Sequence, residues 1–158
     1  MTTAFDFEFT GLNGEPLPLK RFEGQALLVV NVASKCGFTP QYSGLQALYQ
    51  EMHPRGLTVI GVPCNQFLWQ EPATETEIAA FCAVTYSVTF PMTEKTHVKG
   101  SCAHPYFKWM REWLGKAAHP AWNFHKLLTD KTGVPVAAFK SKVEPGSDEL
   151  RAAIAQVL

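Results

Sequence analysis

The sequence lacks a Cys-x-x-Cys pair, although its 158 residues include four cysteines, at positions 36, 64, 82 and 102. This absence excludes a local dithiol, and it removes the paired ligands typical of structural zinc sites. Cys102 is accompanied by His97 and His104, which lack the spacing of helical metal ligands. We therefore expect free or redox-active thiols, no metal and no other cofactor.

The sequence also lacks an excess of charge and a long apolar run. Its 14 basic and 14 acidic residues cancel, which argues against nucleic acid as a partner. The most apolar segment, 26–33, is too short to cross a bilayer, and the N-terminus carries acidic residues where a signal peptide would be positive. We expect a cytoplasmic protein without a stable membrane anchor.

No repeat, low-complexity segment or Pro/Gly/Ser-rich linker divides the chain. A chain of this length can bury a sizeable core without disulfides. The sequence therefore predicts one domain covering residues 1–158.

Hydrophobic periodicity gives the order of the elements. Phe5, Phe7 and Phe9 alternate with acidic residues ahead of Asn13-Gly14, which predicts a hairpin with one buried face. Buried strands are predicted at 26–32 and 57–62, with a helix between them that follows Pro40 and is capped by Thr39. A capping box at Thr74 opens a second helix, which carries Ile78, Phe81, Cys82 and Thr85 on one face. A helix at 105–114, strands near 123–129 and 134–140, and a last helix with Leu150, Ile154 and Leu158 inward complete the chain.

This order, strand–helix–strand, helix, then strand–strand–helix, is that of the thioredoxin-like fold. The predicted class is α/β, with a central mixed sheet flanked by helices on both faces and an N-terminal hairpin.

Cys36 lies in NVASKCGFTP, where a buried strand turns into a helix. The start of a helix and the neighbouring Lys35 both favour a thiolate, the reactive form of cysteine. Thr39 stands where a dithiol enzyme would carry its second cysteine. The alternative interpretation of Cys36 is a small buried hydrophobic residue.

A lone thiolate can attack a peroxide O–O bond and become a sulfenic acid. The departing oxygen then needs neutral hydrogen-bond donors nearby. Five residues are candidates because their segments reach the same end of the sheet: Asn65, Gln66, Gln70, Trp122 and Asn123. Taken singly, each could instead be a structural amide or a buried aromatic.

Four stretches in order resemble the glutathione peroxidase family: NVASKCGFT, PCNQF with QEP, FC followed by Y.VTFPM, and WNF. The resemblance covers nearly the whole chain. It implies a thioredoxin-like fold and the reduction of hydrogen peroxide or organic hydroperoxides. The preferred hydroperoxide stays open at this stage, with lipid hydroperoxides among the candidates. The resemblance also implies that Cys36 is the peroxidatic residue and that Gln70, Trp122 and Asn123 complete a catalytic tetrad.

The same resemblance places Cys82 at the resolving position of the members that thioredoxin reduces, while other members use glutathione directly. A helical cysteine would need local unfolding to reach Cys36. The alternative is that Cys82 fills the core beside Ile78 and Phe81. Cys64, within PCNQF, is expected to be a buried structural thiol.

The chain departs from common members of the family at several positions. These are Leu68-Trp69 before Gln70, Met92-Thr93, His125 after WNF, Phe139-Lys140 in the later strand, and a short stretch at 115–121. Tetrameric members carry an insertion in that last region, so we expect a monomer whose site is open to a protein reductant. The other departures are expected to adjust the choice of substrate and reductant.

Three other functions remain at this stage. The first is direct reduction by glutathione, and the second is a peroxide sensor that passes oxidation from Cys36 to a partner protein. The third is a thioredoxin-fold binding module whose cysteine is silent.

Overall fold

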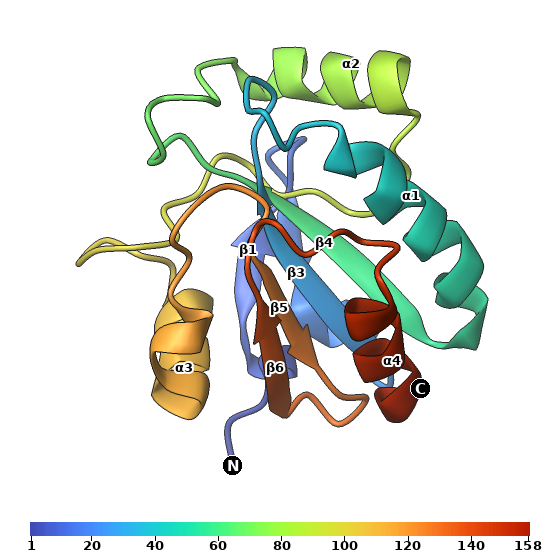
Figure 1. Ribbon diagram of the computed structural model, residues 1–158. Coiled ribbons are helices and arrows are strands. Elements are labelled where there is room, and N and C mark those ends of the chain that lie inside the picture. Colours follow the sequence, from blue (N-terminus) through green and yellow to red (C-terminus); the bar gives the residue numbers. More distant parts are fainter.

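A four-stranded mixed sheet forms the centre of the molecule in this computed structural model, which describes residues 1–158 (Figure 1). The strand order is β4-β3-β5-β6. Strand β3 (Ala26–Val32) is parallel to β4 (Leu57–Pro63) and antiparallel to β5 (Lys126–Thr129), and β5 is antiparallel to β6 (Pro135–Phe139).

Every residue of β3 and β4 is buried, as expected of strands covered on both faces. Alternate residues of β3 serve two separate cores, since successive side chains of a strand point to opposite faces. Leu28 and Val30 belong to one core, whereas Leu27 and Val29 belong to the other.

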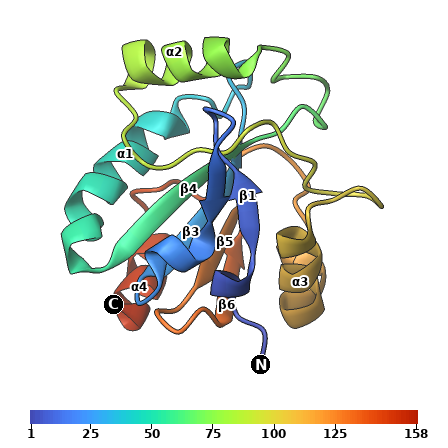
Figure 2. The same ribbon diagram turned by 180° about the vertical axis from the view of Figure 1, so that it is seen from behind.

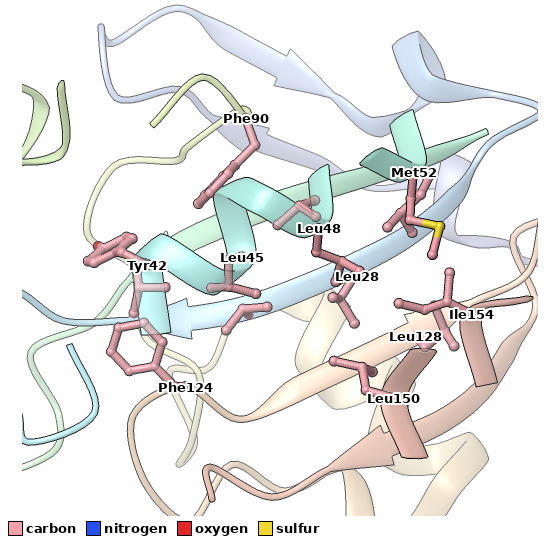
Figure 3. Close-up of a cluster of buried hydrophobic side chains, with 14 of the residues drawn as sticks. Leu28, Tyr42, Leu45, Leu48, Met52, Phe90, Phe124, Leu128, Leu150 and Ile154 are labelled. Atoms are coloured by element: carbon pink, nitrogen blue, oxygen red, sulfur yellow. The ribbon is translucent and has the colours of Figure 1, made fainter. Parts of the chain in front are cut away.

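The first core lies between the sheet and two helices, α1 (Gln41–Met52) and α4 (Asp148–Val157) (Figure 3). Leu45, Leu48 and Met52 point from α1 toward the sheet, at the spacing that the sequence predicted. Figure 3 also shows Tyr42, at the start of α1, next to Phe124; their ring centroids are 5.4 Å apart.

The second core lies between the opposite face of the sheet, helix α3 (Pro105–Leu114) and a hairpin of β1 (Glu8–Thr10) and β2 (Pro16–Pro18) (Figure 2). Pro105 occupies the first position of α3, where its missing N–H is not needed. The α/β class, the mixed sheet, the helices on both faces and the hairpin are therefore confirmed.

Helix α2 (Glu75–Tyr86) lies across the end of the molecule opposite both termini, above the loop between β3 and α1 (Figures 1 and 2). Thr74 and Glu77 form the predicted capping box. Only Ile78 and Cys82 of α2 are buried; of the other two residues predicted to share their face, Phe81 is half-buried and Thr85 is exposed. A helix that buries two residues has little holding it to the body of the protein.

Several predicted boundaries also differ from the structure. Phe5 belongs to a short 3₁₀ helix, Ala4–Asp6, rather than to a strand. Thr39 does not cap α1, because its hydroxyl accepts from the Cys36 N–H at 2.8 Å and donates to the Ala33 carbonyl at 2.9 Å. Pro40 takes the cap position instead.

The strand expected near 123–129 begins only at Lys126, because Phe124 adopts a left-handed conformation with φ of 64°. The strand expected near 134–140 spans Pro135–Phe139, and Leu158 is only half-buried. Three further 3₁₀ helices complete the chain: Leu19–Phe22, His53–Arg55 and Gly115–Ala118. No helix is long and apolar enough to cross a membrane.

Candidate active site

Cys36 lies in a hydrogen-bonded turn between β3 and α1, and it is half-buried. The Thr39 hydroxyl binds the Cys36 N–H, and the Thr39 N–H donates to the Cys36 carbonyl at 3.0 Å. The Phe38 N–H donates to the Cys36 sulfur at 3.4 Å. Thr39, the residue in place of a second cysteine, therefore holds the turn that presents the thiol.

The Gln70 segment is bound to this turn on both sides. The Lys35 N–H donates to the Gln70 carbonyl at 3.0 Å, and the Ser34 hydroxyl donates to the Glu71 carboxylate. Asn65 supports the same loop by accepting from the Glu71 N–H at 3.0 Å. These bonds tie the loop after β4 to the loop after β3, at the shared carboxyl end of the parallel strands.

Asn31, within the apolar strand β3, holds the Trp122–Phe124 segment. Its side-chain amide donates to the Trp122 carbonyl at 2.9 Å, and its backbone carbonyl accepts from the Phe124 N–H at 2.6 Å. Asn31 is 1% exposed. Sequence reasoning missed this residue, although a polar side chain in an otherwise apolar strand was the available signal.

Gln70 and Asn123 meet across the site. The Asn123 side-chain amide donates to the Gln70 Oε1 at 2.9 Å, although the two residues are far apart in the sequence. Because Oε1 is engaged as the acceptor, the Gln70 amide nitrogen remains a donor for another partner. Trp122 is half-buried and packs edge-on against Phe67, with ring centroids 5.8 Å apart.

The other two amide candidates serve the structure of loops instead. Gln66 accepts from the Val98 N–H at 2.7 Å and donates to the Lys99 carbonyl at 3.0 Å, which fixes the segment after Thr96. Asn65 is engaged by Glu71. Of the three amides proposed after β4, only Gln70 is bonded to another predicted site residue, Asn123.

Cys82 is 3% exposed and lies in the same core as Tyr42. Burial raises the pKa of the Cys82 thiol to about 11, although the adjacent Tyr42 hydroxyl counteracts part of this effect. Tyr42 also packs against Phe81 and Tyr86, the aromatic residues that flank Cys82 in α2. In this structure Cys82 therefore occupies the core, the position that the sequence offered as the alternative to a resolving cysteine.

Glu71 is a fully buried carboxylic acid that sequence reasoning also missed. Burial raises its pKa, while hydrogen bonds from Ser34 lower it in part. One carboxylate oxygen binds Ser34 and the other has no partner. The signal was available in the QEP motif, where Glu71 directly follows Gln70.

Lys126 is a fully buried amine beneath the start of α1. Its Nζ donates to the Gln41 Oε1 at 2.6 Å and to the Ser141 carbonyl at 3.0 Å. Burial lowers the pKa of Lys126 to about 8, with partial compensation from Glu144. Since Gln41 is the first residue of α1, this lysine joins β5 to the helix that follows the Cys36 turn.

Of the remaining cysteines, Cys64 donates from its thiol to the Gln66 Oε1 at 3.4 Å. Cys64 is buried, as predicted, and burial raises the pKa of its thiol. Cys102 is exposed. No group of three or more His, Cys, Asp and Glu side chains has the arrangement to hold a metal ion.

Leu68 and Trp69 are one of the departures from the family pattern. Both have left-handed backbones, with φ of 55° and 53°, a conformation that small residues adopt more readily. Their side chains point to solvent and are 68% and 75% exposed. They therefore do not close over the segment of Trp122.

A thioredoxin-like sheet that presents one cysteine, with no second cysteine in its turn, beside buried amides defines a thiol-based redox enzyme. The glutathione peroxidase family model matches residues 4–111, and the chain belongs to that family. It is therefore a thiol peroxidase.

Relatives match over most of their length. The chain is 47% identical to a hydroperoxy fatty acid reductase of Synechocystis, covering 99% of this chain and 96% of the relative. It is 45% identical to a glutathione peroxidase-like peroxiredoxin of Saccharomyces cerevisiae, covering 85% and 84%. The crystal structure of T. cruzi GPX1 superposes with a TM-score of 0.76 at 31% identity, covering 99% and 96%.

Proposed function

We propose that the protein reduces hydrogen peroxide and organic hydroperoxides, including lipid hydroperoxides, at Cys36. The Cys36 thiolate attacks one oxygen of ROOH, the O–O bond breaks, and the departing RO⁻ takes a proton to leave as ROH. Cys36 becomes a sulfenic acid. The name of the Synechocystis relative, hydroperoxy fatty acid reductase, supports a lipid substrate.

The hydrogen bond between Asn123 and Gln70 is the observation that carries this proposal. It joins two segments that are each bonded to β3 or to the turn after it, through Asn31 and Lys35. We assign Gln70, Trp122 and Asn123 as neutral donors that stabilise the thiolate and the departing oxygen. A neutral donor set suits this step because it leaves the single negative charge on sulfur or on the leaving oxygen.

In the second step, the Cys82 sulfur attacks the Cys36 sulfenic acid, a disulfide forms and water leaves. The dithiol of thioredoxin then reduces that disulfide and becomes oxidised itself. For this step the Cys82 thiol must leave the hydrophobic core beneath α2. Because α2 buries only two residues, we expect the helix to open locally and expose it. The name of the yeast relative, glutathione peroxidase-like peroxiredoxin, also supports this assignment.

The burial of Cys82 favours a second candidate as well. A thiol with a pKa raised to about 11 is rarely ionised near neutral pH, so an external thiol could reach the sulfenic acid first. That thiol would belong to glutathione or, if the protein is a sensor, to a partner protein.

The experiment is oxidation of the reduced protein with one equivalent of hydrogen peroxide, followed by peptide mass spectrometry. We expect a Cys36–Cys82 disulfide that thioredoxin opens. A Cys82→Ser variant should keep the first oxidation and lose thioredoxin-dependent turnover. A persistent Cys36 sulfenic acid with Cys82 free would instead favour glutathione or a partner protein as the reductant. Adding each of these to the oxidised protein separately would show which one reduces it.

We also propose that the protein acts as a cytoplasmic monomer. Its four free cysteines suit a reducing compartment. The short 115–121 segment supports the monomer. Size-exclusion chromatography with light scattering would test this, and a mass above 17.5 kDa at micromolar concentration would contradict it.

A further inference from the structure

A groove is lined by Trp122 and by Phe38, a residue of the Cys36 turn. Its volume is about 490 Å³, within the usual range of ligand pockets. The wall nearest Cys36 is formed by Phe38, two residues further along the chain. The remaining lining comes from 3₁₀ helix 115–118 and the loop after it, from β6 and from the segment after β6: Lys116, Ala117, His119, Ala121, Trp122, His125, Ala138, Lys140, Ser141 and Lys142.

The groove combines an apolar interior with a basic rim. Phe38, Trp122 and Ala138 contribute apolar surface, and Lys116, Lys140 and Lys142 are exposed at the rim. No acidic residue lines it. This is a local excess of positive charge in a chain whose charges otherwise cancel.

Three departures from the family pattern converge on this one groove. His125 forms part of the wall and is held there by a hydrogen bond of 2.9 Å between its Nε2 and the Ala117 carbonyl. Lys140, after Phe139, lies on the rim, and the short 115–121 segment forms one side. The sequence predicted that these departures adjust the choice of substrate and reductant. Because all three line this groove, we infer that the groove is where they act.

We propose that this groove binds the acyl chain of a fatty acid hydroperoxide and that its basic rim binds the free carboxylate. This inference rests on the proposed function of Cys36. The chain would lie along Trp122 and Ala138, with its hydroperoxide toward Cys36 and its carboxylate toward Lys140 and Lys142. The enzyme would therefore prefer the free acid to a neutral ester of the same hydroperoxide.

Elementary energetics give the size of the effects. Burial of one methylene strengthens binding by about fourfold, so the acyl chain should lower KM strongly relative to hydrogen peroxide. Each exposed lysine adds only about a two- to fivefold preference for the acid, and salt reduces it. Two lysines together should produce a preference of roughly tenfold at low ionic strength.

The test measures kcat/KM for the hydroperoxide of linoleic acid, for its methyl ester and for hydrogen peroxide, below the micelle concentration of the lipids. For the wild type we expect an acid-to-ester ratio of roughly ten at low salt, falling toward unity at high salt. A Lys140→Gln/Lys142→Gln double variant should lower the ratio at least about fivefold. The matched control is Lys20→Gln/Lys131→Gln, at a hollow near the N-terminus that also contains two lysines, and it should keep the wild-type ratio.

A second variant tests the apolar interior. Ala138→Leu places a larger side chain in the groove and should lower kcat/KM for the acid and the ester about equally, by tenfold or more relative to hydrogen peroxide. If Ala138→Leu proves unstable, Ala117→Leu at the exposed side of the groove replaces it.

An acid-to-ester ratio near one in the wild type would overturn the carboxylate assignment. An unchanged ratio in the Lys140/Lys142 variant would do the same. Failure of the proposed function has a different signature, because the wild type would then not reduce hydrogen peroxide either.

Discussion

Cys36 and Cys82 stand in opposite environments within one end of the molecule. Cys36 is half-buried in a turn, with a backbone N–H directed at its sulfur. Cys82 is 3% exposed inside a helix, and burial raises the pKa of its thiol to about 11. The first environment leaves the thiol in contact with solvent, and the second keeps a thiol protonated and out of reach.

This difference matches the two steps of the proposed cycle. Attack on a peroxide requires a thiolate at all times, whereas a resolving thiol should react only after Cys36 has been oxidised. A buried thiol on a loosely held helix meets that requirement, because it becomes available when the helix opens. The following predictions test the contrast, beginning with the largest effect.

The first prediction concerns alkylation of the reduced protein with iodoacetamide at pH 7.5. A thiol whose pKa is raised from 9.0 to about 11 is ionised roughly 100-fold less near neutral pH, and burial slows its reaction further. We therefore expect Cys82 to react at least about 100-fold more slowly than Cys36, measured by peptide mass spectrometry. The exposed Cys102 is the internal reference. Equal rates for Cys82 and Cys102 would remove the contrast between the two thiols.

The second prediction concerns Asn31→Ala, which leaves the Trp122 carbonyl without its partner. Displacement of Trp122 and Asn123 by a fraction of an ångström should slow the oxidation of Cys36 by about 10- to 100-fold. The measurement is stopped-flow oxidation by hydrogen peroxide in a Cys82→Ser background, with the ultraviolet absorbance of the thiolate followed against pH. Asn13→Ala, which removes a local bond in the hairpin turn, is the control. A normal oxidation rate in a folded Asn31 variant would show that the segment is positioned by other contacts.

The third prediction concerns Lys126, which anchors the first residue of α1. Its pKa is lowered on folding from 10.5 to about 8, so above pH 8 the unfolded chain binds more protons than the native one. The cost of burying the charge is therefore fully present below pH 8 and is relieved as the pH rises. Between pH 7 and pH 9.5, the stability of the wild type relative to Lys126→Met should rise by about 2 kcal/mol.

Urea denaturation of both proteins at the two pH values measures this change. Because the same two proteins are compared, the opposite effect of the raised Cys82 pKa cancels. A difference that does not change with pH would mean that Lys126 keeps an ordinary pKa in the folded protein.

The smallest effect is expected for Thr74→Ala, which removes the capping box of α2. Loss of a cap costs about 1 kcal/mol, so local opening of α2 should become about fivefold more frequent. Alkylation of Cys82 and its disulfide formation with oxidised Cys36 should both accelerate by that factor. Ser147→Ala, at the cap of α4, is the matched control and should leave Cys82 unchanged. Equal acceleration in both variants would indicate global rather than local opening.

Much of the fold followed from local patterns in the sequence. The apolar runs at 26–32 and 57–62, the capping box at Thr74 and the helix at 105–114 were predicted with boundaries close to those observed. Boundaries failed where tertiary contacts or an unusual backbone conformation overrode the local pattern. Thr39 resembles a helix cap, but its hydroxyl binds the Cys36 N–H and the Ala33 carbonyl instead. Phe124 has a left-handed backbone that delays the start of β5.

The candidate site was predicted less completely. The resemblance to the family pointed to Gln70 and Asn123, whose contact the structure contains, but residue type and position alone gave no means of separating Gln70 from Asn65 and Gln66. All three are amides on one loop, and only the folded loop determines which side chain faces Asn123. Asn31 and Glu71 were missed because both act through hydrogen bonds to segments that are distant in the sequence, and only the fold brings these segments together.

The sequence by itself determined the order of the elements, the single thiol at the end of β3 and the donors that could surround it. These features depend on periodicity, residue type and short-range capping, which operate over a few residues. Tertiary structure alone decided that Gln70 meets Asn123, that Cys82 rests in the core with its thiol protonated, and that His125 and Lys140 line the groove beside Trp122. The reason is physical: hydrogen-bond partners, burial and local charge depend on which distant segments the sheet brings together.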